Sequence, residues 1–223
     1  MANKKPSTLV NMLVALLVIA AVSGGVLGLV YGVTKDTIAQ VDLKKNEAAI
    51  KAVLPLDNVN YKADTMLFNY EGVDLILPCN LAYDASGNFM GAAVKTSEGG
   101  FGGKIDMMVG FLADGTIKGT SVLSHAETPG LGANMTGKFK DQFVDKNPAS
   151  YKLTVTKDGG DVDAITAATI TSRAFSKAVD KAYHAFMANK VNFINNNPVA
   201  EEAPVEEAPA EVINETEGGQ SNE

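Results

Sequence analysis

Cysteine is nearly absent from this chain, since Cys79 is its one cysteine among 223 residues. A lone thiol excludes a disulfide, a thiolate zinc site and an iron–sulfur cluster built within the chain, because each of them needs more than one cysteine. The two histidines, His125 and His184, are far apart, and neither has the spacing of a metal-binding motif. We therefore expect no metal site, and interpret His184 as a helix residue and His125 as a loop residue.

Common catalytic and nucleotide-binding motifs are also missing. The chain has no serine-hydrolase elbow and no P-loop, and its glycine clusters lack the strand-to-helix spacing of a dinucleotide fingerprint. A basic surplus is missing too. The formal net charge is −7, and the eight glutamates after residue 199 account for it, which leaves the remainder at about +1. The charge balance argues against a nucleic-acid partner.

Charged residues are lacking between Lys5 and Lys35, and the apolar run in this segment exceeds the roughly 20 residues that a helix needs to cross a bilayer. A cleaved signal peptide is the alternative, but its apolar region is usually about 7–15 residues long, so we predict one transmembrane anchor. Gly24, Gly28 and Gly32 recur at every fourth residue, which favours close packing against another helix. The flanking lysines do not decide the orientation, and we expect the amino terminus inside and the domain outside.

These features divide the chain into four parts. They are an amino-terminal flank and transmembrane anchor (1–34), a connecting helix and linker (35–80), a folded domain (81–198) and an acidic tail (199–223). The tail is rich in Glu, Pro, Ala and Gly and has no basic residue, so we predict that it is disordered.

The folded domain has the pattern of an α+β protein. Short apolar and polar runs alternate over residues 80–124, and Asp114-Gly115 is a strong hairpin signal, which predicts an antiparallel meander. A strand is predicted at 151–155 and a helix at 172–194. We therefore expect an antiparallel sheet with flanking helices, preceded by the transmembrane helix.

Hydroxyl side chains cluster where the predicted strand gives way to the predicted helix, at Thr166, Thr169, Thr171 and Ser172. Such residues commonly cap a helix start, because their oxygens accept hydrogen bonds from the free N–H groups of the first turn. The same N–H groups and the helix dipole also favour a phosphate. Two glycine-rich pieces, EGGFGGK and HAETPGLG, either make tight turns or let the backbone approach a flat cofactor, and we favour the cofactor.

The segments HAETPGLG (125–132) and DAITAATITS (163–172) resemble the FMN-binding domain shared by the G subunit of the Rnf complex and the C subunit of the sodium-pumping NADH:quinone reductase. In this family a threonine in the pattern Asp, two residues, Ser or Thr, Gly, Ala, Thr is joined through its oxygen to the phosphate of FMN. Thr169 stands at that position. The pattern departs from the family at Ala167, which replaces a glycine, a change that matters only if the position requires a positive φ.

The resemblance implies that FMN is held covalently on Thr169 by a phosphodiester, formed with the help of a separate flavin transferase. The residues implied for the phosphate and its motif are Asp163, Thr166, Ala167, Ala168, Thr171 and Ser172, and those expected around the ring are Gly100, Gly102, Glu127, Thr128, Gly130, Leu131 and Gly132.

The resemblance further implies an electron-transfer flavoprotein of a translocase that couples ferredoxin oxidation and NAD reduction to ion transport. The domain would lie on the extracytoplasmic side of the cytoplasmic membrane, and the other membrane subunits would contact the anchor through Gly24, Gly28 and Gly32. The short chain favours the Rnf subunit over the quinone-reductase subunit. A membrane-anchored interaction domain without redox chemistry is the remaining alternative.

Overall fold

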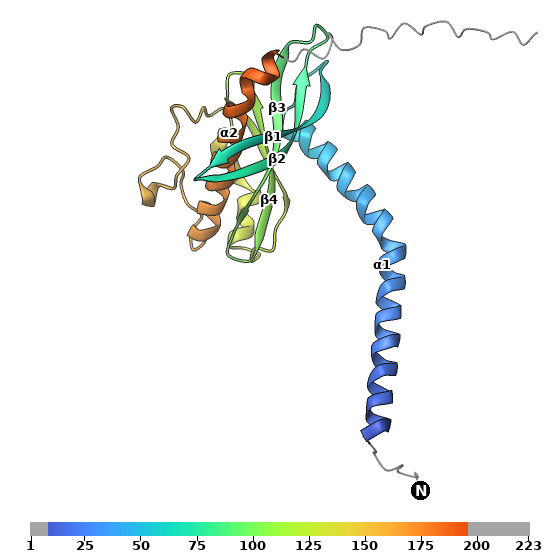
Figure 1. Cartoon of the computed structure of the whole chain (residues 1–223). Helices are drawn as coiled ribbons and strands as arrows, with labels where there is room; N and C mark the ends of the chain where they lie inside the picture. Colours follow the sequence, from blue (N-terminus) through green and yellow to red (C-terminus); the bar gives the residue numbers. More distant parts are fainter. Residues whose placement is uncertain (1–8, 196–223) are drawn as a thin grey trace, which may run out of the picture.

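The computed structural model describes residues 9–195 and contains an antiparallel five-stranded meander between two long helices (Figure 1). The strands follow one another in the sheet as they do in the chain, and confirm the predicted α+β class. The elements are α1 (Leu9–Val53), β1 (Asn60–Tyr70), β2 (Val73–Tyr83), β3 (Phe89–Gly99), β4 (Lys104–Leu112), β5 (Ile117–Ser124), the 3-10 helices η1 (Gly132–Thr136), η2 (Lys138–Phe143) and η3 (Thr156–Asp158), and α2 (Thr169–Asn195). The predicted acidic tail lies outside the described residues.

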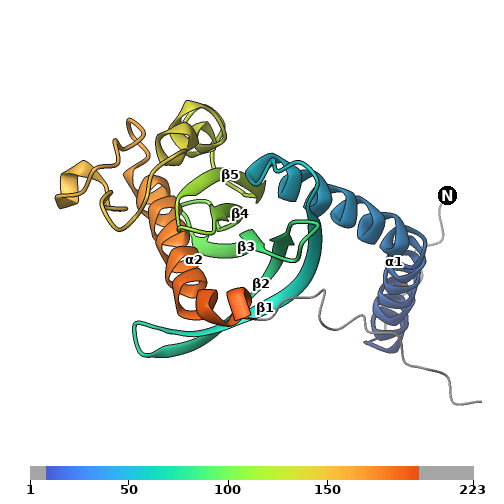
Figure 2. The same ribbon diagram turned by 90° about the horizontal axis from the view of Figure 1, so that it is seen from above.

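α2 covers one face of the sheet, and only the carboxyl-terminal end of α1 packs on the other face, as Figure 2 shows. Successive residues of a strand point to opposite faces, so Met107 of β4 belongs to the core under α2, whereas Met108 belongs to the core under α1. On the α2 side, Phe111 and Phe186 stack with ring centroids 5.2 Å apart. On the α1 side, Val53 is fully buried against the sheet.

Two glycines let the end of α1 rest directly on the sheet. Gly110 of β4 and Gly119 of β5 are cross-strand partners. A Cβ on Gly110 would overlap the carbonyl oxygen of Val53, and a Cβ on Gly119 would lie 3.0 Å from the Cα of Val53. Residues without a side chain are therefore required where the last turn of α1 crosses these strands.

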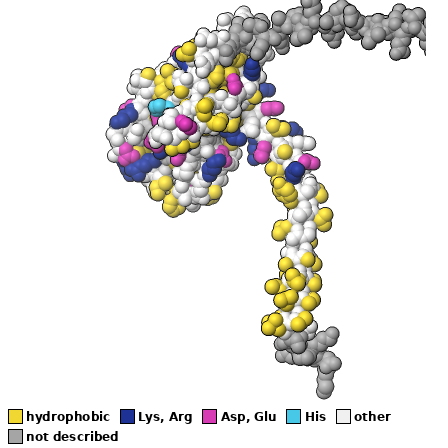
Figure 3. Space-filling view, viewed as in Figure 1, with side chains coloured by type: hydrophobic (Ala, Val, Ile, Leu, Met, Phe, Trp, Pro, Cys, Tyr) yellow, Lys and Arg dark blue, Asp and Glu magenta, His cyan; other side chains and the backbone are white. Residues whose placement is uncertain are grey.

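α1 is the one helix within residues 9–195 that is long and apolar enough to cross a membrane. Its large apolar side chains are exposed from Leu9 to Val33, and Figure 3 shows them along the helix. The helix continues to Val53 without interruption, so the predicted connecting helix is an extension of the anchor.

The structure corrects the expectation that residues 35–80 form only a helix and a linker. β1 and most of β2 lie in this segment and form the edge hairpin of the sheet. The alternation was hard to recognise because both faces of the hairpin carry apolar side chains. Met66 and Phe68 are buried, whereas the cross-strand partners Leu67 and Ile76 are exposed. A period of two is a weak signal when both faces are apolar.

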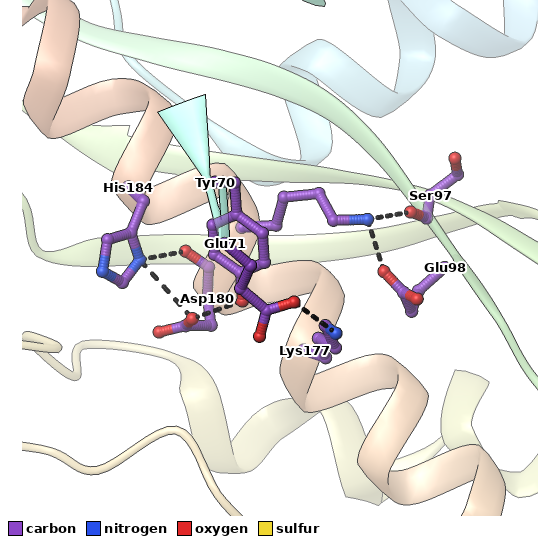
Figure 4. A network of polar contacts seen from close by, with 8 residues as sticks. Tyr70, Glu71, Ser97, Glu98, Lys177, Asp180 and His184 are labelled. Carbon is purple, nitrogen blue, oxygen red and sulfur yellow. Dashed lines mark hydrogen bonds and ion pairs between the residues drawn. The ribbon is translucent and has the colours of Figure 1, made fainter. Parts of the chain in front are cut away.

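Polar contacts attach the tip of this hairpin to α2 (Figure 4). The Tyr70 hydroxyl donates a hydrogen bond to Asp180 at 2.8 Å, and the Lys177 ammonium lies 2.9 Å from the carboxylate of Glu71. Burial, together with the hydrogen bond to Asp180, raises the pKa of Tyr70 above its ordinary value, so the hydroxyl keeps its proton. The hairpin is therefore part of the folded domain.

The strand predicted at 151–155 was wrong, whereas the hairpin predicted at Asp114-Gly115 is confirmed. Gly115 connects β4 to β5 with φ 97°. Val155 makes only an isolated parallel bridge with Val162. The chain turns back between these two residues at Gly159, which has φ 79°, so the predicted strand is too short to form a ladder.

Candidate functional site

The hydroxyl cluster lies in the first turn of α2, but none of its members occupies the capping position. Thr169 is the first helical residue, and Ala168 precedes it. The carbonyl oxygen of Ala168 accepts the N–H of Ser172 at 3.0 Å, which closes the first helical turn. Alanine has no side-chain oxygen, so the N–H groups of this turn receive no cap from it. Helix capping therefore does not explain the cluster.

Two of the hydroxyls are buried and hold neighbouring segments in place. Thr171 donates a hydrogen bond to a carboxylate oxygen of Glu127 at 2.8 Å. The Ser172 hydroxyl accepts the N–H of Ile165 at 2.9 Å and donates to the carbonyl of Ala168 at 3.0 Å. These groups position the start of α2 and are committed to protein partners.

The other two hydroxyls face open space. Thr169 is half-buried and lines a cavity of about 380 Å³, whereas Thr166 is exposed and lines a neighbouring, more open hollow of about 660 Å³. Residues 163–166 line the open hollow, whereas residues 167–171 line the cavity. Thr169 is thus the hydroxyl at the helix start that lines the less open of the two spaces.

Ala167 adopts the left-handed conformation, with φ 61°. The expectation that alanine is harmless here depended on the position not requiring a positive φ, and the structure shows that it does. A residue with a Cβ is disfavoured in this region by roughly 1–2 kcal/mol. The sharp turn that brings Thr169 to the cavity is therefore strained, as backbone at functional sites often is.

The cavity is formed by three segments that are distant in the sequence: the turn between β3 and β4, the loop after β5 and the start of α2. Of the residues expected around a ring, Glu127, Thr128, Leu131 and Gly132 line it, as do Ala167, Ala168, Thr169 and Thr171 from the attachment motif. Gly100, Gly102 and Gly130 are not among the lining residues.

Two residues that sequence reasoning missed complete the mouth of the cavity. Phe101 and Ile170 line it with side chains that are 71% and 52% exposed. The signal for Phe101 was its place as a lone aromatic residue between two glycine pairs. Exposed apolar side chains at a cavity mouth suit the face of a flat ring better than they suit water.

Two glycines of the site, Gly100 and Gly132, make room for Glu127. A Cβ on Gly100 would overlap one carboxylate oxygen of Glu127, and a Cβ on Gly132 would overlap the other. Glu127 is only 5% exposed. One of its oxygens accepts the backbone N–H of Gly102 at 2.9 Å. The carboxylate therefore forms part of the wall between the cavity and the core.

The approach to the motif is held by an amide side chain. Gln142 of η2 accepts the N–H of Asp163 at 2.9 Å and donates to its carbonyl oxygen at 3.1 Å. These paired bonds fix the backbone of Asp163 and leave its carboxylate at the exposed surface. Asp163 is thus placed beside Thr166 in the open hollow, away from the cavity that Thr169 lines.

The histidines have local roles. The Nδ1 atom of His125 accepts the N–H of Glu127 at 3.2 Å, and Nδ1 of His184 lies 2.9 Å from the carbonyl oxygen of Asp180. Over residues 9–195 there is no group of three or more His, Cys, Asp or Glu side chains arranged to hold a metal ion.

Comparison with known proteins identifies the family and relatives that this chain is similar to. The FMN-binding domain family matches residues 100–184, which include all three segments of the cavity. The G subunit of an ion-translocating oxidoreductase complex from Methanosarcina acetivorans is 35% identical over 82% of this chain and 95% of its own length. The G subunit of the Na⁺-translocating ferredoxin:NAD⁺ oxidoreductase complex from Acetobacterium woodii is 32% identical over 77% of this chain and 88% of its own. The crystal structure of the C subunit of a Na⁺-translocating NADH–quinone reductase from Parabacteroides distasonis covers 70% of this chain and 94% of its own, with 18% identity and a TM-score of 0.47.

Proposed function

We propose, from the premise that this chain belongs to the family formed by the G subunits of ion-translocating oxidoreductase complexes, that it carries its FMN as a phosphodiester on Thr169. Members of this family are electron-transfer subunits of a membrane complex, and FMN is the group that accepts and donates the electrons. The observation that carries the assignment is the position of Thr169 at an uncapped helix start inside the cavity.

The residues around Thr169 fit a phosphate. Free N–H groups at a helix start, together with the positive end of the helix dipole, stabilise an anion. Attachment would join the Thr169 oxygen to the FMN phosphorus of a donor that carries FMN as a phosphoanhydride. The second phosphate group of that donor would leave with the electrons of the broken P–O bond, and the hydroxyl proton would pass to a base of the flavin transferase. Thr171 and Ser172 are unsuited to this step because their hydroxyls are buried in hydrogen bonds with other parts of the chain.

The remaining lining residues fit the ring. Thr128 and Gly132 offer polar atoms from the loop after β5, and Leu131 and Phe101 offer apolar surface at the mouth. The volume of about 380 Å³ lies within the usual range of small-molecule pockets. A shallow, partly apolar site keeps one edge of a ring near the surface, where a partner cofactor can exchange electrons with it.

The membrane arrangement is part of the same proposal. α1 anchors the protein, with its amino terminus in the cytoplasm and the flavin domain on the extracytoplasmic side of the cytoplasmic membrane. A Cβ at Gly24, Gly28 or Gly32 would meet no described atom within 4 Å, so this face is open to a helix of another membrane protein of the complex. Ferredoxin and NAD are the proposed electron donor and acceptor of the whole complex.

The test is the change of Thr169 to alanine in the full chain, expressed with its flavin transferase. A covalent flavin survives denaturation, so the wild-type band should fluoresce under ultraviolet light in a denaturing gel, whereas Thr169→Ala should not. Thr166→Ala is the matched comparison, because it removes the other open hydroxyl; it should weaken attachment without abolishing the fluorescence. Mass spectrometry that located the flavin on Thr166 or Thr171, with Thr169 free, would refute the assignment.

A further inference from the structure

Glu127 is the one acidic or basic side chain that is buried among residues 9–195. Burial of a carboxylate is costly unless its oxygens are hydrogen-bonded, so a residue of this kind usually has a specific role. Both oxygens accept hydrogen bonds, from the N–H of Gly102 at 2.9 Å and from the hydroxyl of Thr171 at 2.8 Å. Both contacts use the carboxyl oxygens as acceptors, which suits a carboxylate.

These two hydrogen bonds connect the three segments that form the cavity. Gly102 lies in the turn between β3 and β4, Glu127 in the loop after β5, and Thr171 in the first turn of α2. Two further glycines, Gly100 and Gly132, leave the space that the carboxylate oxygens occupy. The walls of the cavity are thus assembled around one charged group.

The charge of this group is not matched by a cation. None of the ion pairs between described residues includes Glu127, and its hydrogen-bond donors are a neutral amide and a neutral hydroxyl. Away from water, the field of such a charge reaches neighbouring groups with little screening. Since Glu127 itself lines the cavity, a cofactor bound there lies within this field.

We infer that Glu127 is the positioning residue of the FMN site, and that its negative charge lowers the reduction potential of the bound flavin. The inference rests on the proposed function, because it takes FMN to be the occupant of the cavity. Reduction adds negative charge to the flavin, so a fixed negative charge beside it opposes the gain of an electron. The same carboxylate holds the glycine-rich turn and the start of α2 in the arrangement that receives the cofactor.

Glu127→Gln separates the two effects. The Gln oxygen can accept the N–H of Gly102, and its NH₂ group can donate to the Thr171 hydroxyl, which is able to accept. The side chain keeps its size and both connections and loses only its charge. Glu127→Ala removes the connections as well as the charge. Asp114→Asn is the matched control, because it removes one exposed negative charge at the β4–β5 turn, at the opposite end of β4 from the glycine-rich turn.

Covalent flavin content and midpoint potential are measured on the full-length, flavinylated chain in detergent. Urea unfolding of the same variants is measured in a Thr169→Ala background, which holds no flavin. We expect Glu127→Gln to keep the gel fluorescence and the unfolding curve close to those of the parent. Its equilibrium constant for one-electron reduction of the flavin should rise at least tenfold, which is a shift of about 59 mV toward positive potential. Glu127→Ala should lower both flavin content and stability, and Asp114→Asn should leave the potential unchanged.

Each failure has a distinct meaning. A fluorescent Glu127→Gln protein with the potential of the wild type would overturn the role of the charge. If Glu127→Ala has the same free energy of unfolding as its parent in the flavin-free background, the role of Glu127 in positioning is overturned. Absence of flavin from the wild-type chain would instead overturn the proposed function, while the unfolding data would still decide the positioning role.

Discussion

Replacing Ala167 by glycine should stabilise the chain even though it removes a methyl group from a folded segment. Ala167 is exposed and has φ 61°. A residue with a Cβ is disfavoured there by roughly 1–2 kcal/mol. Glycine loses roughly 0.5–1 kcal/mol more conformational freedom on folding. At the midpoints of these two ranges, the difference predicts a net gain of about 0.8 kcal/mol in the free energy of unfolding, because little packing is lost at an exposed site.

Urea unfolding of the full chain, followed in detergent and in the flavin-free Thr169→Ala background, measures this gain without a contribution from the cofactor. Ala164→Gly is the matched control. It makes the same change three residues earlier, at a position without a positive φ, and should lose roughly 0.5–1 kcal/mol. Ala167→Val should be less stable than the parent, because a β-branched residue is least tolerant of the left-handed region.

The reasoning is refuted if the two glycine variants lose stability by similar amounts. Such a result would mean that the left-handed turn at Ala167 carries no measurable strain. The departure from the glycine of the family pattern would then have no energetic consequence in this chain, and strain could not be linked to the placement of Thr169.

Two further predictions concern the sheet. Gly110→Ala should lower the free energy of unfolding by roughly 1–3 kcal/mol in a urea titration, because the new Cβ overlaps the carbonyl of Val53 at the end of α1. Gly99→Ala is the control and should be close to neutral, because a Cβ at Gly99 meets nothing within 4 Å. Burial raises the pKa of the Cys79 thiol to about 12, so the native chain should resist thiol reagents at pH 9. Between the pKa of the unfolded thiol and that of the folded thiol, only the unfolded state releases the proton. The free energy of unfolding should therefore fall by about 1.4 kcal/mol per pH unit in this range. Cys79→Ala should lack this component of the alkaline loss, and a similar loss in both chains would assign it to other groups.

Features that depend on neighbouring residues were predictable from the sequence. The long apolar helix follows from an uncharged run, and the β4–β5 turn follows from Asp114-Gly115. The helix predicted at 172–194 is confirmed, but it begins three residues earlier, at Thr169. The β1–β2 hairpin was missed because Leu67 and Ile76 make its outer face apolar, which removes the alternation that marks a strand. The strand expected at 151–155 failed for a related reason, since a strand needs a partner and Val155 has only one bridge.

The sequence by itself determined the long apolar helix, the fold class and the segment that contains Thr169, because each depends on residues that are close together in the chain. Only the tertiary structure decided which hydroxyls are open. Thr171 and Glu127 are 44 residues apart, and their hydrogen bond exists because β5 and α2 bring the two segments together. Likewise, Gly100 and Gly132 read as room for a ring, whereas the fold fills the space beside them with a carboxylate. Hydrogen bonding and exclusion of volume act between atoms that are near in space, and a sequence pattern does not contain those distances.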